Sequence, residues 1–250
     1  MQGNRRIAWL HGWGMSSRIW EDLSSLFPEA EHHYIDYTHC TEPEHYRAAV
    51  RRLLASGDSR PWSLVGWSLG GILALEEVIC GQLCVDSVVL IGATLKFTAD
   101  DRAKGWPKRV LERMIKQVRC DPQAVVESFA AAMLTQEELE LADRQRLLEY
   151  AAEAVPETAD SLAAGLGLLL ESDLTGRWAA WRAQAEGGQG AAKPRLLWIH
   201  GQADAICPPG AMPDDLTERE RSVLAAAGHA PMVTQRARLE HELRGFWHGD

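Results

Sequence analysis

Residues 62–71 read WSLVGWSLGG and lead from an apolar run, through a turn, into the helical pattern of residues 71–79. A strand, a sharp turn and a helix in this order form the setting in which Gly-x-Ser-x-Gly makes a nucleophile elbow. Ser68 would then lie in a strained backbone conformation, and Gly66 and Gly70 would remove side chains that collide beside it. The stretch predicts a nucleophilic Ser68; the alternative is a glycine-rich turn that carries a surface serine.

Two backbone amides near this turn are candidates to stabilise a developing negative charge. The amide of Leu69 would begin the helix, and helix N-termini bind anions. A second amide should come from the loop after the first strand, where residues 11–14 read HGWG and the glycines allow the backbone to approach a substrate. We therefore predict an oxyanion hole made by the N–H groups of Trp13 and Leu69, and we interpret His11 as structural.

The pattern outside this stretch predicts an α/β fold. Short apolar or alternating runs typical of strands occur at residues 7–10, 33–37, 63–66, 85–92, 196–199 and 222–224. Helical spacing of apolar residues separates most of these runs. Because strands that alternate with helices form βαβ units, we expect a mostly parallel central sheet flanked by helices.

The middle of the chain interrupts this alternation with helical patterns alone. Four helices are expected there, and Thr135 followed by Glu138 matches a capping box at the start of the third. Helices between two strands of one sheet form an insertion, and the glycine-rich residues 187–192 would be its flexible return to the core. We therefore expect an α/β core of residues 1–93 and 183–250 and an inserted helical lid of residues 94–182.

Composition excludes several classes of function. The 250 residues include 24% charged and 46% hydrophobic side chains, as is usual for a soluble globular protein. The formal net charge of −9 disfavours nucleic acid and anionic membranes as partners. The longest apolar stretch, residues 162–170, is too short to span a bilayer. Five scattered cysteines without a CxxC pair indicate a reduced protein, so we expect a cytoplasmic location.

A group of histidines near the second strand raises the question of a metal site. The group comprises His32, His33, Cys40, His39 and His45. Adjacent residues of a strand point to opposite faces of the sheet, and the spacing fits no familiar zinc pattern. We therefore expect no metal and no cofactor.

Two loops late in the chain carry the partners that a serine nucleophile needs. A serine hydroxyl requires a histidine to take its proton and a third group to orient that histidine. Asp204 follows the fifth expected strand and His229 follows the sixth, and the carboxyl ends of parallel strands meet at one edge of a sheet. We predict a catalytic triad of Ser68, Asp204 and His229. The alternatives are an Asx-turn aspartate and a structural histidine.

Four motifs together resemble the α/β-hydrolase superfamily. They are His-Gly-Trp-Gly at 11–14, Gly-Trp-Ser-Leu-Gly-Gly at 66–71, Gly-x-x-Asp at 201–204 and Gly-His-Ala-Pro at 228–231. Serine, aspartate and histidine follow one another in that superfamily's order. The two tryptophan-containing motifs are similar to those of BioH-type pimeloyl-[acyl-carrier protein] methyl ester esterases. The N-terminal antiparallel hairpin usual in the superfamily is missing, and the insertion otherwise matches poorly.

The resemblance implies an α/β-hydrolase fold and a serine carboxylesterase that acts on the methyl ester of pimeloyl-[acyl-carrier protein] in biotin biosynthesis. The site residues that it implies are the triad Ser68, Asp204 and His229, the oxyanion amides of Trp13 and Leu69, and the substrate-binding side chains of Trp13, Trp67 and Phe129. Two alternatives stay open: an esterase of small free acyl esters, and a non-catalytic binding protein of the same fold.

A basic segment of the insertion bears on the substrate. Its seven bases are Arg102, Lys104, Lys108, Arg109, Arg113, Lys116 and Arg119, and its one acid is Glu112. Acyl-carrier proteins are strongly acidic, so a basic face beside the entrance to the site would attract one. The alternative is an ordinary solvated helix face.

Overall fold

A parallel β-sheet lies at the centre of the computed structural model, which describes residues 5–57, 59–80, 83–139, 143–153, 158–184 and 193–249. The strands of the described residues are β1 (Arg6–Leu10), β2 (Glu31–Tyr34), β3 (Trp62–Trp67), β4 (Val85–Ile91), β5 (Arg195–Gly201) and β6 (Arg221–Leu224). They pair in the order β2-β1-β3-β4-β5-β6, and each neighbouring pair is parallel. The structure therefore confirms the predicted parallel sheet.

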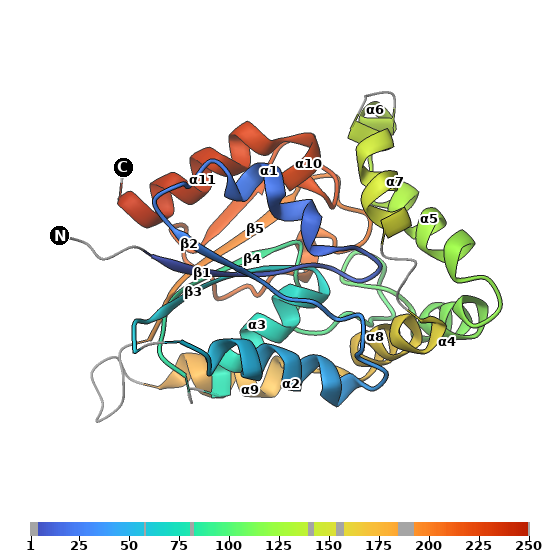
Figure 1. The fold of residues 1–250 in the computed structure, drawn as a ribbon, viewed down its shortest axis with the longest axis horizontal. Coiled ribbons are helices and arrows are strands. Elements are labelled where there is room, and N and C mark those ends of the chain that lie inside the picture. Colours follow the sequence, from blue (N-terminus) through green and yellow to red (C-terminus); the bar gives the residue numbers. More distant parts are fainter. Residues whose placement is uncertain are drawn as a thin grey trace.

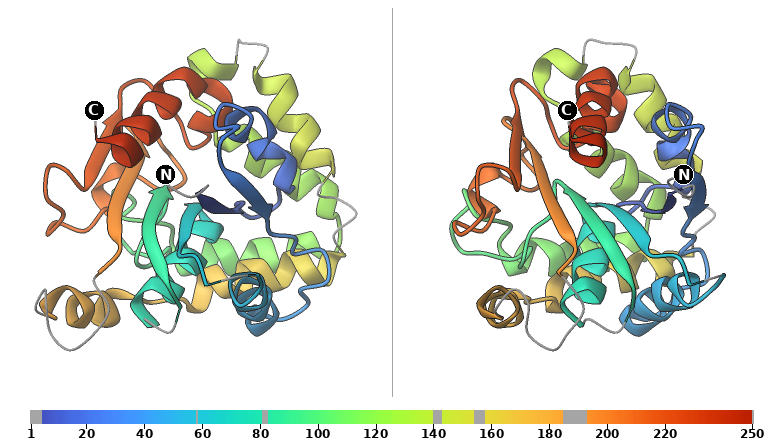
Figure 2. Two further views of the ribbon diagram at one scale, coloured as in Figure 1. Left: turned by 60° about the vertical axis from the view of Figure 1, so that its left-hand side comes forward. Right: turned by 90° about the vertical axis from the view of Figure 1, so that its left-hand side faces the viewer.

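Helices cover both faces of this sheet (Figures 1 and 2). On one face lie α2 (Pro43–Leu54), α3 (Leu69–Cys80) and α9 (Thr175–Ala183). On the other face lie α1 (Glu21–Ser24), which follows the short 3₁₀ helix Ser17–Trp20, with α10 (Pro231–Thr234) and α11 (Arg236–His248). Strands enclosed in this way read as continuous apolar runs, and β1 and β3 are buried along their whole length.

The second strand lies earlier than its sequence pattern predicts. The pattern places it at 33–37, whereas β2 spans Glu31–Tyr34. Its partner β1 ends at Leu10, and the amide of Ile35 still donates to the carbonyl of Trp9 at 3.1 Å before the strands diverge. The alternation of buried side chains continues past the strand to Ile35 and Tyr37, which explains the misplaced bounds.

The insertion between β4 and β5 contains more helices than the four expected. In the described part of the chain they are α4 (Lys108–Val118), α5 (Pro122–Ala132), α6 (Gln136–Leu139), α7 (Asp143–Glu153), α8 (Ala159–Glu171) and α9. Helices α4 to α8 gather at the carboxyl ends of the strands (Figure 1). By contrast, α9 packs on the sheet, where the ring of Trp178 lies 5.7 Å from that of Trp198 in β5. The expected return at 187–192 lies outside the described residues.

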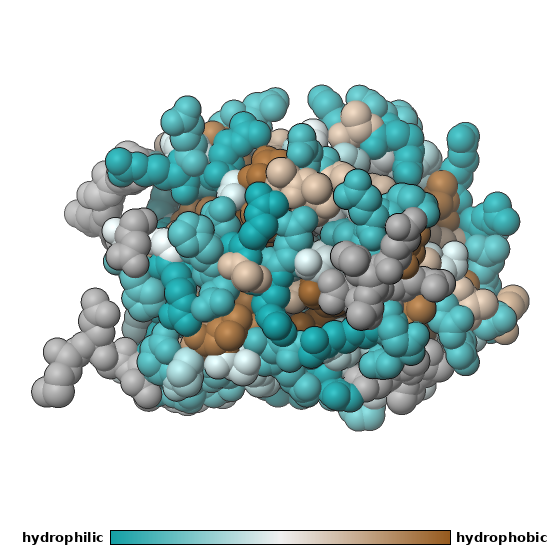
Figure 3. Space-filling model, turned by 90° about the horizontal axis from the view of Figure 1, so that it is seen from above, coloured by the Kyte–Doolittle hydropathy of each residue, from teal (hydrophilic) through white to brown (hydrophobic). Residues whose placement is uncertain are grey.

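The surface seen from above is largely hydrophilic, and hydrophobic residues emerge on it only in small patches (Figure 3). Among the described helices, each is too short or too polar to cross a bilayer. The large apolar side chains instead form the core, which includes the fully buried indoles of Trp9, Trp20 and Trp198.

Candidate active site

Ser68 lies at a sharp turn between β3 and α3. Its φ angle is +55°, in a region that few residues other than glycine adopt. The turn brings backbone so close to Gly66 and Gly70 that neither position has room for a side chain. A Cβ on Gly66 would lie 2.5 Å from the carbonyl oxygen of Gly70, and a Cβ on Gly70 would lie 2.2 Å from the carbonyl oxygen of Leu10. The Ser68 amide is anchored by the carbonyl of Ile91 at 2.9 Å. The strain and the close packing have the geometry of a nucleophile elbow.

Asp204 and His229 form a fully buried pair. The Nδ1–H group of His229 donates to Oδ2 of Asp204 at 2.7 Å, and neither side chain is exposed. The other carboxylate oxygen, Oδ1, accepts the amides of Ile206 and Cys207 at 2.9 and 2.8 Å. Asp204 therefore makes the turn contacts of an Asx-type residue and also fixes the orientation and tautomer of the imidazole.

A glycine at the end of β4 makes room for this pair. Gly92 has a φ of +50°, and a Cβ there would lie 2.9 Å from Nδ1 of His229 and 3.2 Å from Oδ2 of Asp204. The sequence pattern marks Gly92 only as the end of a strand. Its position was the sequence signal for this role: it is a glycine directly after a buried strand, and the neighbouring strands are followed by the predicted catalytic residues.

Trp67 links the elbow to the histidine. Its buried indole donates from Nε1 to the carbonyl oxygen of His229 at 2.8 Å, and the two rings lie 5.4 Å apart. A Cβ on Gly12 would touch both the indole of Trp67, at 2.9 Å, and the Cβ of Ser68, at 3.2 Å. The structure thus brings Ser68, Trp67, Gly12 and the Asp204–His229 pair together at one end of the sheet.

The remaining imidazole nitrogen of His229, Nε2, is buried and has no hydrogen-bond partner among the residues that the structure describes. In a serine triad this nitrogen takes the proton of the nucleophile. No hydrogen bond joins it to Ser68 in the described chain, and such bonds are often loose before substrate binds.

The two predicted oxyanion amides belong to segments that meet at the elbow. Leu69 is the first residue of α3, so its amide has no acceptor within its own helix. Trp13 follows Gly12 and is held by its side chain, which donates from Nε1 to the carbonyl of Leu162 in α8 at 2.7 Å. Its indole also meets the ring of Phe129 edge-on at 5.0 Å. The insertion thereby fixes the loop that carries the Trp13 amide.

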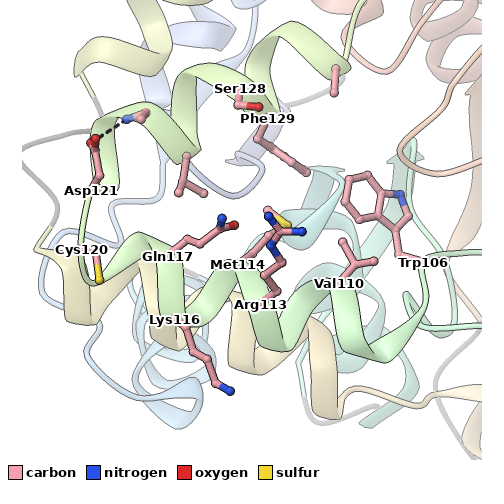
Figure 4. Close-up of a pocket in the computed structure, with 13 residues that line it drawn as sticks. Trp106, Val110, Arg113, Met114, Lys116, Gln117, Cys120, Asp121, Ser128 and Phe129 are labelled. Carbon is pink, nitrogen blue, oxygen red and sulfur yellow. Dashed lines mark hydrogen bonds between the residues drawn. The ribbon is translucent and has the colours of Figure 1, made fainter.

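A groove of about 660 Å³ lies between α4 and α5 (Figure 4). Phe129 and Trp106 line it, with ring centroids 6.0 Å apart, and Met114 and Val110 add further apolar surface. Because Phe129 contacts Trp13 as well, one side chain touches both the groove and the loop beside Ser68. Ser68 itself is only 3% exposed.

The basic segment forms an exposed surface on and before α4. All seven of its lysine and arginine side chains are exposed. The described ion pair within it joins Lys108 to Glu112 at 3.9 Å, and Arg102 lies over the ring of Trp106 at 4.9 Å. Arg113 and Lys116 also line the groove, so the positive charge adjoins its entrance.

Burial changes the protonation of several groups around the site. Desolvation lowers the pKa of His11 to about 4, although its hydrogen bond with the Gly12 carbonyl opposes this change. Desolvation also lowers the pKa of His200 to about 4, with the nearby charge of Asp204 opposing it. The pKa of the Cys207 thiol is raised by burial and then by Asp204. Cys207 is thus a packing thiol with little thiolate character.

The histidines near β2 take part in structural contacts. His32 accepts a hydrogen bond from the Trp9 indole at 3.0 Å, and His33 pairs with Glu31 at 2.7 Å. Within the part of the chain that the structure describes, no three histidine, cysteine, aspartate or glutamate side chains are grouped to hold a metal ion.

Comparison with known sequences identifies related proteins. A sequence model described as the alpha/beta hydrolase family matches residues 7–242. A pimeloyl-[acyl-carrier protein] methyl ester esterase from Photobacterium profundum is 27% identical over 247 residues, covering 95% of this chain and 92% of the relative. The enzyme of the same name from Edwardsiella ictaluri is 29% identical over 243 residues, with 93% and 89% coverage.

Solved structures share the fold at lower identity. An esterase from Exiguobacterium antarcticum superposes with a TM-score of 0.78 at 17% identity, covering 98% of this chain and 92% of that one. A bromoperoxidase from Bacillus anthracis gives a TM-score of 0.78 at 18% identity, with 97% and 91% coverage. Since the two proteins bear the names of different activities, this likeness shows the architecture alone.

Proposed function

Because the chain belongs to the alpha/beta hydrolase family, we propose that it is a serine carboxylesterase with the triad Ser68, Asp204 and His229. The observation that carries the proposal is the buried Asp204–His229 pair, with a bond of 2.7 Å, beside a serine held at a φ of +55°. Binding a ligand does not require an imidazole that is oriented by a carboxylate and lies next to a strained serine, whereas nucleophilic catalysis does.

The proposed reaction passes through an acyl-enzyme. His229 takes the proton of Ser68 as its oxygen attacks the ester carbonyl, and the amides of Trp13 and Leu69 stabilise the resulting oxyanion. The protonated imidazole, stabilised by Asp204, then donates its proton to the leaving alcohol. In the second half His229 activates a water molecule, which releases the acid and restores the serine.

We further propose that the substrate is the methyl ester of pimeloyl-[acyl-carrier protein], which would place the enzyme in biotin biosynthesis. Relatives over most of the chain carry that name. The apolar groove beside Phe129 suits an acyl chain without a charge at its tip. The exposed bases of residues 102–119 suit an acidic carrier protein at the groove's entrance. In this proposal Trp13, Trp67 and Phe129 bind the acyl chain.

The same proposal divides the chain into a core of residues 1–93 and 183–250 and a lid of residues 94–182. The position of α4 to α8 over the carboxyl ends of the strands supports it (Figure 1). The packing of α9 on the sheet does not support placing this last helix in the lid. A cytoplasmic location is also part of the proposal, supported by five scattered cysteines without a CxxC pair.

A fluorophosphonate probe tests the catalytic part of the proposal. We expect the wild-type protein to be labelled and Ser68→Ala to lose labelling entirely, because the probe reacts only with an activated serine. Ser25→Ala, which changes an exposed serine outside the groove and the elbow, is the matched control and should label normally. A wild-type protein that stays unlabelled would leave only the non-catalytic binding protein.

Hydrolysis of two substrates separates the remaining alternatives. The wild-type enzyme should cleave the methyl ester of pimeloyl-[acyl-carrier protein] with a much higher kcat/KM than a small chromogenic ester. An enzyme that cleaves the small ester and ignores the carrier-bound ester is an esterase of free esters. Restored growth of a biotin-requiring strain that lacks this esterase would support the pathway.

A further inference from the structure

Glu138, in the short helix α6 of the insertion, is a buried carboxylate outside the proposed triad. It is 4% exposed, and buried carboxylates are costly unless hydrogen bonds satisfy them. Glu138 accepts three such bonds. One, from the amide of Thr135 to Oε2 at 2.8 Å, completes the capping box with the return bond from the Glu138 amide to the Thr135 hydroxyl. The capping box fixes the side chain in one orientation.

The other carboxylate oxygen reaches the segment of residues 228–234 that carries His229 (the His229 loop). Oε1 accepts the amide of Gly228 at 3.1 Å and the hydroxyl of Thr234 at 2.6 Å. These two donors lie immediately before and shortly after His229 in the chain. One oxygen of the insertion therefore holds both sides of the segment that presents the imidazole, and Gly228 is 90 residues away from Glu138 along the chain.

The backbone of the insertion presses on the same loop. The amide of His229 donates to the carbonyl of Met133 at 2.7 Å. A Cβ on Gly228 would lie 2.5 Å from that carbonyl oxygen and 2.6 Å from Oε2 of Glu138, so only glycine allows this approach. The carbonyl of His229 is held from the other side by Trp67. Both polar backbone atoms of His229 thus have fixed partners.

We propose that Glu138 is a positioning residue, which holds the His229 loop so that the imidazole meets both Asp204 and Ser68. The proposal rests on the proposed function, because it assigns to the insertion a part in aligning the base. Glu138 touches neither the imidazole nor Ser68 among its described contacts, so it acts through the main chain of the loop.

Variants of the capping box separate positioning from stability. Glu138→Ala removes the bonds to the His229 loop and the cap, whereas Thr135→Ala removes the cap hydroxyl alone. Glu138→Gln keeps one carbonyl oxygen that can still accept from Gly228 and Thr234. The exposed neighbour Glu137→Ala is the matched control. The assays are kcat and KM on a chromogenic ester, the melting temperature, and the downfield NMR signal of the His229 Nδ1 proton.

We expect Glu138→Ala to lower kcat about 10- to 100-fold with KM within twofold, and to shift or broaden the Nδ1 proton signal. Glu138→Gln should recover most of the wild-type kcat and of the wild-type Nδ1 proton signal. Thr135→Ala should lose thermal stability while it keeps kcat and the signal, and Glu137→Ala should match wild type.

The proposal is overturned if Glu138→Ala keeps kcat and the signal, or if Thr135→Ala loses both as its melting temperature falls. If Glu138→Ala does not fold, Thr234→Val, which removes the hydroxyl that donates to Oε1 of Glu138, decides: a lowered kcat with a perturbed signal that Thr135→Ala lacks supports positioning, and a wild-type signal together with wild-type kcat refutes it. A wild-type protein that cleaves no ester contradicts the proposed function, and the NMR signal still tests Glu138.

Discussion

The carboxyl edge of the sheet and the inserted helices differ in how their polar groups are satisfied. At the sheet edge, Asp204, His229 and Ser68 are buried and held by short contacts, and nearby glycines leave no room for a further atom. On α4, the basic side chains are exposed and largely surrounded by solvent. Short contacts fix geometry, whereas exposed charges act over several ångströms and are screened by salt. The first region suits chemistry, and the second suits recognition.

The largest expected effect breaks the geometry of the sheet edge. Asp204→Asn should lower kcat by a factor of roughly 10⁴, because an amide no longer enforces the tautomer in which Nδ1 of His229 carries the proton. Steady-state kinetics on a chromogenic ester measure it. Asp215→Asn is the matched control, since it changes an exposed aspartate that bonds the Trp178 indole. A value of kcat within tenfold of wild type for Asp204→Asn would contradict the proposed triad.

A feature of this molecule could be predicted from sequence when its contacts join residues that are close together in the chain. The elbow depends on residues adjacent in the chain, so its strand, turn and helix were all predicted, as was the parallel sheet. The contacts of Gly92 and Glu138 depend on residues far away in sequence, and the only local sign of either was the position of Gly92 directly after a buried strand. The capping box of Thr135 was predicted because it is local, while the second use of its glutamate was not.

The insertion was predicted least well. Its apolar stripes indicated four helices, whereas the described residues form six: α6 and α7 both lie where the third was expected, and α9 was not expected at all. Helical periodicity also does not tell which neighbour a helix packs against, so residues 94–182 were all assigned to the insertion although α9 packs on the sheet and α8 lies at the strand ends.

An intermediate effect is expected from the exposed charges of α4. Arg109→Glu with Arg113→Glu should lower kcat/KM for the carrier-bound ester about tenfold at low salt, because an acidic carrier would be repelled. Hydrolysis of a small neutral ester should not change, and the difference should shrink as salt is added.

The control for this pair introduces the same charge elsewhere. Arg52→Glu with Arg219→Glu changes two exposed arginines outside the insertion by the same total charge. It should leave both substrates unaffected. If it slows the carrier-bound ester equally, net charge and not the basic face governs the encounter.

The smallest expected effect concerns stability and comes from the buried histidines beside the site. His11 and His200 have a pKa of about 4 in the folded chain, against 6.5 ordinarily, chiefly because burial penalises their charged form. Above pH 6.5 both states are neutral. Between pH 6.5 and 4 the unfolded chain binds protons that the folded chain does not. As the pH is lowered from 6.5 to 4, the free energy of unfolding should therefore decrease by about 1.4 kcal/mol per pH unit for each histidine.

His200→Leu sharpens this prediction, because neither ring nitrogen of His200 has a hydrogen-bond partner in the described part of the chain. Leucine removes the titrating group without breaking a bond, so the slope of unfolding free energy between pH 6.5 and 4 should decrease by one proton's contribution. Urea unfolding at several pH values measures this slope. An unchanged slope would mean that the pKa of His200 is the same in the folded and unfolded chains, which burial and the nearby His229 oppose.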